Sequence, residues 1–363
     1  MAIKLRKEIL DLEVYKAGKP ISEVKRELGL EEVIKLASNE NPFGCSPLAK
    51  KELMEIIEES QMYPDAANFA LKKKLGEKHG VNPNRIFCGT GSDSLIKVIC
   101  NCFVEPGDEC IVAEITFPRY DSCIKLMGGN TVRIPMKNNG LDIEAMVDAI
   151  NEKTKIIWFC NPNNPTGTVF SKKDFEKVLD RIPEHVLIIM DEAYIEYVTR
   201  EDFPDSLEYI DRYPNMLTLR TFSKAYGLAS LRVGYGIASE ELVGYFNRVI
   251  GPFDVNLYAQ TAAVAALGDE EFLQKVYDEN NKGKEYLYRE FDKMGLEYAP
   301  SEANFVFVNI NVPTEEVFDK LLRKGLIVRP GHLLDSPGYL RVTIGTMEQN
   351  ERFIKALREI LGK

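Results

Sequence analysis

The 363-residue chain lacks the features that mark several classes of protein. Its 46 Lys and Arg are outnumbered by 56 Asp and Glu, and the formal net charge of −10 argues against a general nucleic-acid binder. Its seven Cys form no C-x-x-C pair, so we expect no metal site, and free thiols are typical of a cytoplasmic protein. No segment approaches the roughly 20 apolar residues of a membrane helix, and the charged N-terminus has no apolar signal core.

Length and composition are those of an ordinary globular protein. The chain is 45% hydrophobic and 28% charged, and at about 150 residues per domain it is long enough for two domains. We expect an N-terminal arm over residues 1–38, with a short helix at Ile21–Leu28 followed by an extended run. A large domain over residues 39–255 and a small C-terminal domain over residues 256–363 would follow.

The segment from residue 85 to residue 237 alternates short apolar runs with longer helical patterns. The predicted strands are Ile86–Cys88, Cys110–Ala113, Thr131–Ile134, Ile156–Cys160, Val186–Met190, Met216–Leu219 and Val233–Ile237, and the helical patterns include Ser94–Phe103, Ile143–Ile150 and Lys172–Arg181. Short, continuously apolar strands that alternate with helices predict an α/β fold with a mainly parallel central sheet covered on both faces. In such sheets, ligands bind beyond the carboxyl ends of the strands.

The pattern changes after about residue 255. A long helical stretch over Leu257–Met294 precedes predicted strands near Asn304–Ile310, Ile327–Arg329 and Tyr339–Ile344, and a closing helix runs over about Glu348–Leu361. These elements predict a smaller α+β domain, with an active site in the crevice between the two domains.

Two ionisable residues come just after predicted buried strands. Asp191 directly follows an apolar run, so its carboxylate is expected at the ligand-binding edge of the sheet, and Tyr194 lies three residues further on. Lys224 follows the next strand and is flanked by small residues; an amine shielded from water has a lowered pKa and attacks carbonyl groups. Taken singly, Asp191 could instead cap a helix or loop, and Lys224 could be a solvated surface residue.

Polar loops after other strands add a possible anion site. The glycines of Gly89–Ser94 and the helix N-terminus after them can bind an anion, and Ser223 and Arg232 near Lys224 would complete a phosphate cradle. The loop lacks the third Gly of a dinucleotide fingerprint, which disfavours a dehydrogenase. The Pro-rich loop Asn161–Gly167 could aim an Asn amide at a ligand or be only a rigid turn. A lysine, an acid and a phosphate site together are what pyridoxal phosphate requires.

At these residues the sequence resembles a known family. The segment Thr221–Ser230 is similar to the pyridoxal-lysine signature of class II aminotransferases, and Asn163–Gly167 and Asp191–Tyr194 stand at the family's usual order and distance. Further motifs at Ser38–Gly44, Tyr63–Asp65 and Leu340–Thr346 resemble those of the histidinol-phosphate aminotransferase family. The resemblance runs nearly end to end and implies a fold-type I pyridoxal-phosphate transferase.

The resemblance also implies roles for individual residues. Lys224 would bind the cofactor as a Schiff base and then act as acid and base, and Asp191 would pair with the protonated pyridine nitrogen. Tyr194 and Asn164 would hydrogen-bond the phenolic oxygen of the ring, and Phe117 would stack on it. The phosphate would be surrounded by Gly91, Ser92, Asp93, Ser223 and Arg232, with Tyr63 reaching the phosphate of the neighbouring subunit. The substrate would be held by Tyr15, Asn39, Arg329 and Arg341.

The implied activity is transamination between histidinol phosphate and 2-oxoglutarate in histidine biosynthesis, by a homodimer with shared active sites. An aromatic amino acid aminotransferase and a threonine-phosphate decarboxylase remain alternatives, because they share most of these motifs. A non-catalytic ligand-binding module is disfavoured because no basic DNA-binding extension precedes the motifs. Two residues depart from the family pattern: Phe117 stands where Tyr is common, and Ser94 stands where Glu is usual.

Overall fold

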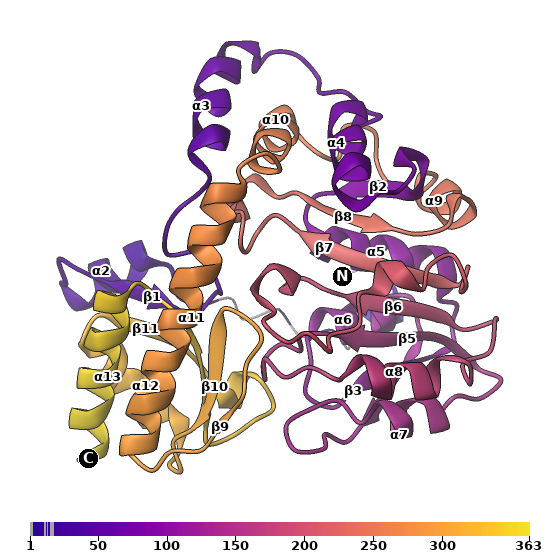
Figure 1. Ribbon diagram of the computed structural model, residues 1–363. Coiled ribbons are helices and arrows are strands. Elements are labelled where there is room, and N and C mark those ends of the chain that lie inside the picture. Colours follow the sequence, from indigo (N-terminus) through magenta and orange to yellow (C-terminus); the bar gives the residue numbers. More distant parts are fainter. Residues whose placement is uncertain (1–2, 11, 13, 15–17) are drawn as a thin grey trace.

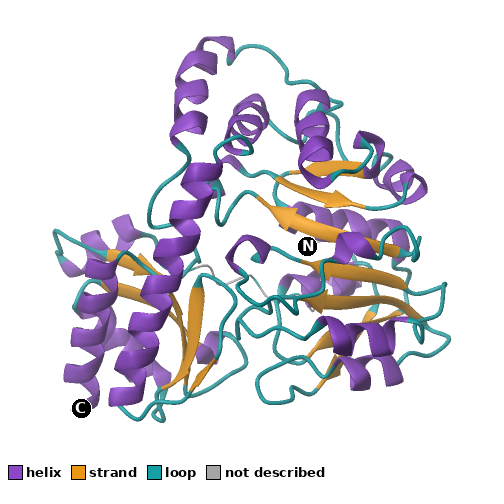
Figure 2. Cartoon of the chain, viewed as in Figure 1, coloured by secondary structure: helices purple, strands orange, loops and turns teal. Residues whose placement is uncertain are grey.

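The computed structural model describes residues 3–10, 12, 14 and 18–363, and it contains two β-sheets, each packed against helices (Figures 1 and 2). Tyr15, which the sequence places at the substrate, lies outside the described residues. Within the described part of the chain, no helix is both long enough and apolar enough to cross a bilayer.

The larger sheet has seven strands in the order β2-β8-β7-β6-β5-β3-β4. Its strands are β2 (Ile86–Gly89), β3 (Glu109–Ala113), β4 (Asn130–Ile134), β5 (Thr154–Cys160), β6 (Leu187–Asp191), β7 (Met216–Thr221) and β8 (Gly234–Ile237). The five strands from β3 to β7 run parallel, and only β8 is antiparallel to its neighbours β2 and β7. The predicted mainly parallel sheet is therefore confirmed, with every predicted strand present within two residues of its bounds.

Helices cover both faces of this sheet, so its strands are apolar throughout. Along β6, Leu187 and Ile189 join one core while Ile188 and Met190 join the other, as the alternation of side chains along a strand requires. One core contains residues of α5 (Ser92–Phe103), α6 (Arg119–Leu126) and α9 (Glu240–Phe246). The other contains residues of α3 (Pro47–Ile56), α4 (Phe69–His79), α7 (Ile143–Asp148), α8 (Lys172–Leu179) and α10 (Leu257–Ala266).

The smaller sheet joins the beginning of the chain to its C-terminal third. Its strand order is β1-β11-β12-β10-β9, formed by β1 (Ile34–Leu36), β9 (Tyr298–Ala299), β10 (Phe305–Asn309), β11 (Leu326–Pro330) and β12 (Tyr339–Thr343). The helices near it are α2 (Ile21–Leu28), α11 (Glu270–Lys293), α12 (Thr314–Arg323) and α13 (Met347–Leu361). A short helix, α1 (Lys7–Leu10), precedes α2 in the chain. Short 3₁₀ turns lie at Ile57–Glu59, Pro83–Arg85, Ile195–Tyr197, Ser206–Glu208, Ala229–Leu231 and Gly331–Leu333.

The single long helix predicted over Leu257–Met294 is wrong. The stretch is two helices, α10 and α11, because the chain turns at Gly268 and the Asp269 carboxylate then caps α11 by accepting from the Phe272 backbone N–H at 3.2 Å. Helix α10 packs in the core of the large sheet, whereas α11 extends toward the small one (Figure 1). The domain division at residue 255 stays a prediction.

Candidate active site

A cavity of about 270 Å³ lies at the carboxyl ends of the parallel strands, facing β11 and β12 of the small sheet. Most of the residues that the sequence singles out share its lining. They are Asn39, Ser92, Asp93, Phe117, Asn164, Asp191, Tyr194, Ser223, Lys224, Arg232, Arg329 and Arg341. The fold thus brings together side chains up to 302 positions apart, from Asn39 after β1 to Arg341 within β12.

Asp191 is the last residue of β6 and is 3% exposed. One carboxylate oxygen accepts a hydrogen bond from the Tyr120 hydroxyl at 2.6 Å, and the other accepts from the Ala193 backbone N–H at 3.2 Å. Burial raises the pKa of Asp191 to about 6, although these two donors and the nearby Lys224 oppose the rise. The carboxylate is therefore held in one orientation and remains mostly ionised at neutral pH.

Lys224 follows β7 and lies on the same cavity wall. Its Nζ donates to the backbone carbonyl of Ser38 at 3.3 Å and lies 5.6 Å from the centre of the Tyr194 ring. Burial lowers the pKa of Lys224 to about 8, and the positive charges of Arg341 and Arg232 lower it further. An amine with this pKa is partly neutral near physiological pH, as a nucleophile toward an aldehyde must be.

The N-terminus of α5 and Arg232 form an anion cradle. Gly91 has φ +79°, and a Cβ at this position would lie 2.6 Å from a guanidinium nitrogen of Arg232. The Arg232 guanidinium also donates to the Ala229 carbonyl at 2.9 Å and to the Ser223 hydroxyl at 3.5 Å. Backbone N–H groups at the start of a helix together with a guanidinium are the usual partners of a phosphate. Ser92, the first residue of the helix, lines the cavity here.

Asp93 and Phe117 also line the cavity. The Asp93 carboxylate is paired with Arg119, whose Nε lies 2.6 Å away, so its negative charge is balanced. The Phe117 ring contacts the edge of the Tyr120 ring at 5.7 Å between centroids. Phe117 thus offers an apolar face to a ligand ring.

Tyr194 and Asn164 are hydrogen-bonded to residues from distant parts of the chain. The Tyr194 hydroxyl accepts from the side-chain amide of Asn39 at 2.9 Å, and burial raises its pKa. The Asn164 side-chain oxygen accepts from the Arg341 guanidinium at 2.6 Å. Asn39 in turn bonds Thr343 of β12 through both its backbone N–H and its side chain, each at 3.0 Å.

Two buried arginines form the small-sheet wall of the cavity. Arg329 of β11 and Arg341 of β12 are direct cross-strand partners, and both line the cavity. Arg341 also donates to the Ala37 carbonyl at 2.5 Å. Two guanidinium groups side by side predict a site for an acidic substrate group, because their fork geometry matches carboxylate and phosphate oxygens.

Tyr63 does not line this cavity. It is 82% exposed and stacks on Phe253, with 4.6 Å between ring centroids. Its expected contact is with the cofactor of a second subunit, which a single chain does not test. The role therefore stays a prediction.

Tyr120 is the residue of the site that the sequence reasoning missed. Its hydroxyl bonds Asp191, and its ring stacks on Trp158 at 4.6 Å between centroids. The available signal was its position three residues after Phe117. Pro118 is the N-cap of α6 and Arg119 its first residue, so Tyr120 lies in the first helical turn after Phe117. A tyrosine in this turn is directed at the same strand ends as Phe117.

The donor set fits pyridoxal phosphate. An ionised carboxylate, an amine of lowered pKa and an anion cradle line one cavity, beside an aromatic face. The cradle also requires a glycine at position 91, because a Cβ there would collide with the Arg232 guanidinium. Among the described residues, no group of three or more His, Cys, Asp or Glu is placed to hold a metal ion.

Comparisons with known proteins agree with this chemistry. The sequence model described as aminotransferase class I and II matches residues 31–357. The histidinol-phosphate aminotransferase of Caldicellulosiruptor saccharolyticus is 48% identical, covering 98% of this chain and 99% of the relative. That of Moorella thermoacetica is also 48% identical, covering 99% and 93%. The crystal structure of histidinol-phosphate aminotransferase from Sinorhizobium meliloti in complex with pyridoxal-5'-phosphate matches with a TM-score of 0.90 at 26% identity, covering 99% of this chain and 98% of that one.

Proposed function

The chain belongs to the class I and II aminotransferase family, and we propose that it transfers an amino group between histidinol phosphate and 2-oxoglutarate in histidine biosynthesis. It is an aminotransferase, and its cofactor is pyridoxal phosphate. The observation that carries the substrate proposal is the pair Arg329 and Arg341 beside Lys224 in one cavity. That pair suits substrates whose acidic groups alternate between phosphate and carboxylate.

The bound cofactor supplies a ring that withdraws electrons from the substrate carbon carrying the amino group. Asp191 would hold a proton on the ring nitrogen, because its buried carboxylate is kept in place by Tyr120 and by the Ala193 backbone. Such a charge-assisted hydrogen bond contributes about 1.5–3 kcal/mol. Lys224 would first bind the cofactor covalently and, once released, carry the proton between the two reacting carbons. Its pKa of about 8 suits both accepting and returning a proton near neutral pH.

The remaining cavity residues would bind and orient the reactants. Gly91, Ser92, Ser223 and Arg232 would hold the phosphate of the cofactor, with Asp93 nearby, and Phe117 would cover one face of its ring. Tyr194, through its hydroxyl proton, and Asn164, through its amide NH₂, would donate to the phenolic oxygen of the ring. Both can keep their present bonds, in which their oxygens accept from Asn39 and Arg341. Asn39, which also lines the cavity, would contact the substrate.

We propose that the same two arginines serve both halves of the reaction. Arg341, fixed to Asn164 and to the Ala37 carbonyl, would take a carboxylate of glutamate. Arg329 would take the second carboxylate, or the phosphate of the other substrate. The acidic groups of each substrate, two carboxylates or one phosphate, carry about two negative charges at neutral pH. Either substrate would therefore neutralise the two arginines.

A homodimer is also part of the proposal. Apolar side chains from Met54 to Phe69 are exposed: Met54, Ile57, Met62, Tyr63 and Phe69 are each more than half exposed in the single chain. If a second copy of the chain covered this segment, Tyr63 of each copy would lie near the cavity of the other. The free state of all seven cysteines supports a reducing, cytoplasmic location.

A substrate panel on the purified, cofactor-loaded protein tests the proposal. We expect the ratio kcat/KM to be highest for histidinol phosphate with 2-oxoglutarate. A higher ratio for phenylalanine or tyrosine would instead indicate an aromatic aminotransferase, and release of carbon dioxide from threonine phosphate would indicate a decarboxylase. The variant Lys224→Ala is the control, because it should bind the cofactor without a borohydride-reducible bond and show no turnover.

A further inference from the structure

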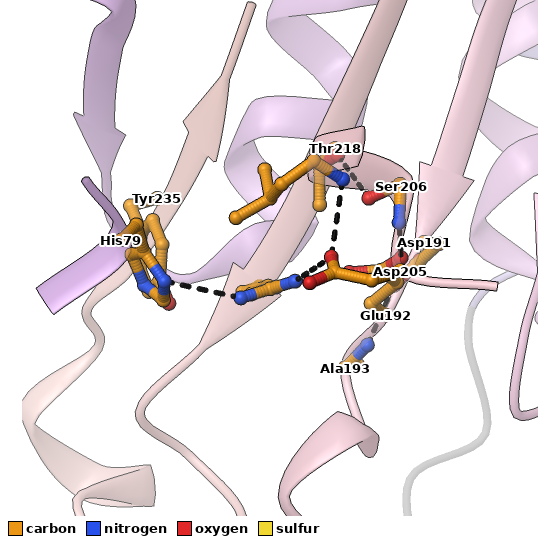
Figure 3. Close-up of polar contacts among 10 residues, drawn as sticks. His79, Asp191, Glu192, Ala193, Asp205, Ser206, Thr218 and Tyr235 are labelled. Carbon is orange, nitrogen blue, oxygen red and sulfur yellow. Dashed lines mark hydrogen bonds and ion pairs between the residues drawn. The ribbon is translucent and has the colours of Figure 1, made fainter. Parts of the chain in front are cut away.

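A second cluster of charged residues lies directly behind the reacting pair. Glu192 follows Asp191 in the chain, and Arg220 precedes Lys224 by four residues. Glu192 is fully buried and Arg220 is 5% exposed, yet neither residue lines the cavity. Figure 3 shows Glu192 next to Asp191, with Asp205, Ser206 and Thr218 around it and with His79 and Tyr235 on the far side.

The two side chains form an ion pair in which two nitrogens of Arg220 converge on one oxygen of Glu192. Arg220 donates to one oxygen of Glu192 through Nε at 2.9 Å and through a terminal nitrogen at 2.8 Å. The other Glu192 oxygen accepts from the Ser206 backbone N–H at 3.3 Å, and Arg220 reaches Asp205 at 3.3 Å. Both carboxylate oxygens are therefore satisfied, and the guanidinium has little freedom to rotate.

The cluster continues to α4 and β8 through His79. The Arg220 guanidinium lies 3.4 Å from Nδ1 of His79, and Nε2 of the same ring lies 2.9 Å from the Tyr235 hydroxyl. Because a guanidinium can only donate, Nδ1 is the accepting nitrogen and Nε2 carries the proton. Burial and the charge of Arg220 lower the pKa of His79 to about 3, so the ring is neutral.

The ion pair lies where the backbone hydrogen bonds between β6 and β7 end. The ladder between β6 and β7 ends with Asp191 paired to Leu219 and with the Glu192 N–H donating to the Leu219 carbonyl at 2.9 Å. Beyond this point β6 has ended, whereas β7 continues toward Lys224. The Glu192–Arg220 pair is thus the next bond across the two strand ends after the backbone bonds stop.

We propose that Glu192 and Arg220 are positioning residues that fix the distance and orientation between the Asp191 carboxylate and the Lys224 amine. The inference rests on the proposed use of these two groups against one cofactor ring. Neighbouring side chains on a strand point to opposite faces, so Glu192 holds the backbone of Asp191 from the face opposite the cavity. Arg220 does the same for the start of the loop that carries Lys224.

Stability alone does not require a buried charge pair at this place. Replacing such a pair with apolar residues of similar volume is often neutral or stabilising. Charge-assisted hydrogen bonds from two donors to one oxygen add directional geometry that apolar packing lacks. Removing the pair should therefore disturb the relation of Asp191 to Lys224 more than it disturbs the fold.

The test is the double variant Glu192→Met/Arg220→Met, with Arg220→Lys as a milder variant that keeps the charge and loses the fork. The control is Glu290→Gln, which weakens a half-buried pair with Arg358 near the small sheet, where N and O lie 2.7 Å apart. Each purified full-length protein is measured for Tm, for kcat and KM with whichever amino donor the wild type accepts, and for the pH at which the visible absorbance of the bound cofactor titrates.

We expect the double variant and Arg220→Lys to keep their fold, to lose about 10- to 100-fold in kcat with KM changed much less, and to titrate at a shifted pH. Glu290→Gln should leave kcat and the titration unchanged. Wild-type kcat and titration in a folded Arg220→Lys protein, or equal losses in Glu290→Gln, would overturn the inference. The absorbance titration needs no substrate, so an error in the proposed substrate would not affect it.

Discussion

Tyr120→Phe is the substitution that isolates the hydrogen bond to Asp191. The tyrosine is buried, and its ring stacks on Trp158 at 4.6 Å between centroids. Phenylalanine keeps the ring and this stacking, so the change removes only the hydroxyl that lies 2.6 Å from the Asp191 carboxylate. The variant therefore tests whether Tyr120 keeps Asp191 ionised.

The expected size follows from the energy of that bond. A hydrogen bond to a charged group contributes about 1.5–3 kcal/mol, and 1.36 kcal/mol corresponds to one pH unit in a pKa. Without the hydroxyl, the pKa of Asp191 should rise above its present value of about 6 by roughly one to two pH units. At pH 7 the ionised fraction would fall about 2- to 10-fold, whereas at pH 9 it would remain nearly complete.

The assay is the dissociation constant of the apoenzyme for pyridoxal phosphate, measured at pH 7 and at pH 9. The ratio of variant to wild type should be about 2 to 10 at pH 7 and close to 1 at pH 9, because in the proposed mechanism only ionised Asp191 would hold the ring-nitrogen proton. Other titrating groups, Lys224 included, cancel in this ratio. A ratio that is the same at both pH values would refute the reasoning.

Tyr226→Phe is the matched control for this measurement. Tyr226 is also buried, and its hydroxyl contacts no hydrogen-bond partner among the described residues. It packs in the core on the opposite face of the large sheet from Tyr120. Its ratio should be close to 1 at both pH values.

Three further outcomes follow from the site. Gly91→Ala should weaken cofactor binding measured by titration calorimetry, because the new Cβ would lie 2.6 Å from the Arg232 guanidinium. The control Gly80→Ala should bind the cofactor as the wild type does, since Gly80 shares the positive φ but a Cβ there would meet no atom within 4 Å. The rate at which apoenzyme captures the cofactor aldehyde should rise with pH with a midpoint of about 8, since neutral Lys224 is the nucleophile, and a stopped-flow midpoint near 10.5 would contradict this. Arg341→Lys keeps the charge but loses the fork and should raise the KM for 2-oxoglutarate about tenfold; an unchanged KM would remove Arg341 from the substrate site.

The sequence predicted the parts of the fold that depend on local pattern. The run Val186–Met190 is apolar because both faces of its strand are buried, and this alone places Asp191 at a strand end. The same reasoning located Lys224 after β7 and Gly91 before α5. Each of these positions follows from a few consecutive residues.

Two features were missed, for different reasons. The break at Gly268 has a local signal, a glycine followed by an aspartate that caps α11, but it lies within a continuous helical pattern. His79 stands next to polar residues in the sequence, yet the fold brings it to Arg220 and Tyr235, 141 and 156 positions away. No local pattern encodes such pairings, so burial of these polar groups could not be foreseen.

The reactivity of Lys224 combines contributions from both sheets. Burial against the large sheet is the main cause of its lowered pKa, and the next is the charge of Arg341, which stands on β12 of the small sheet. Arg341 is held there by Asn164 of the large-sheet loops and by the carbonyl of Ala37, next to β1. If an acidic substrate group neutralises Arg341, one cause of the low pKa is removed, and the amine becomes a stronger base when a substrate proton has to be taken. In the proposed mechanism, the arginine that would bind the substrate therefore also adjusts the group that would act on it.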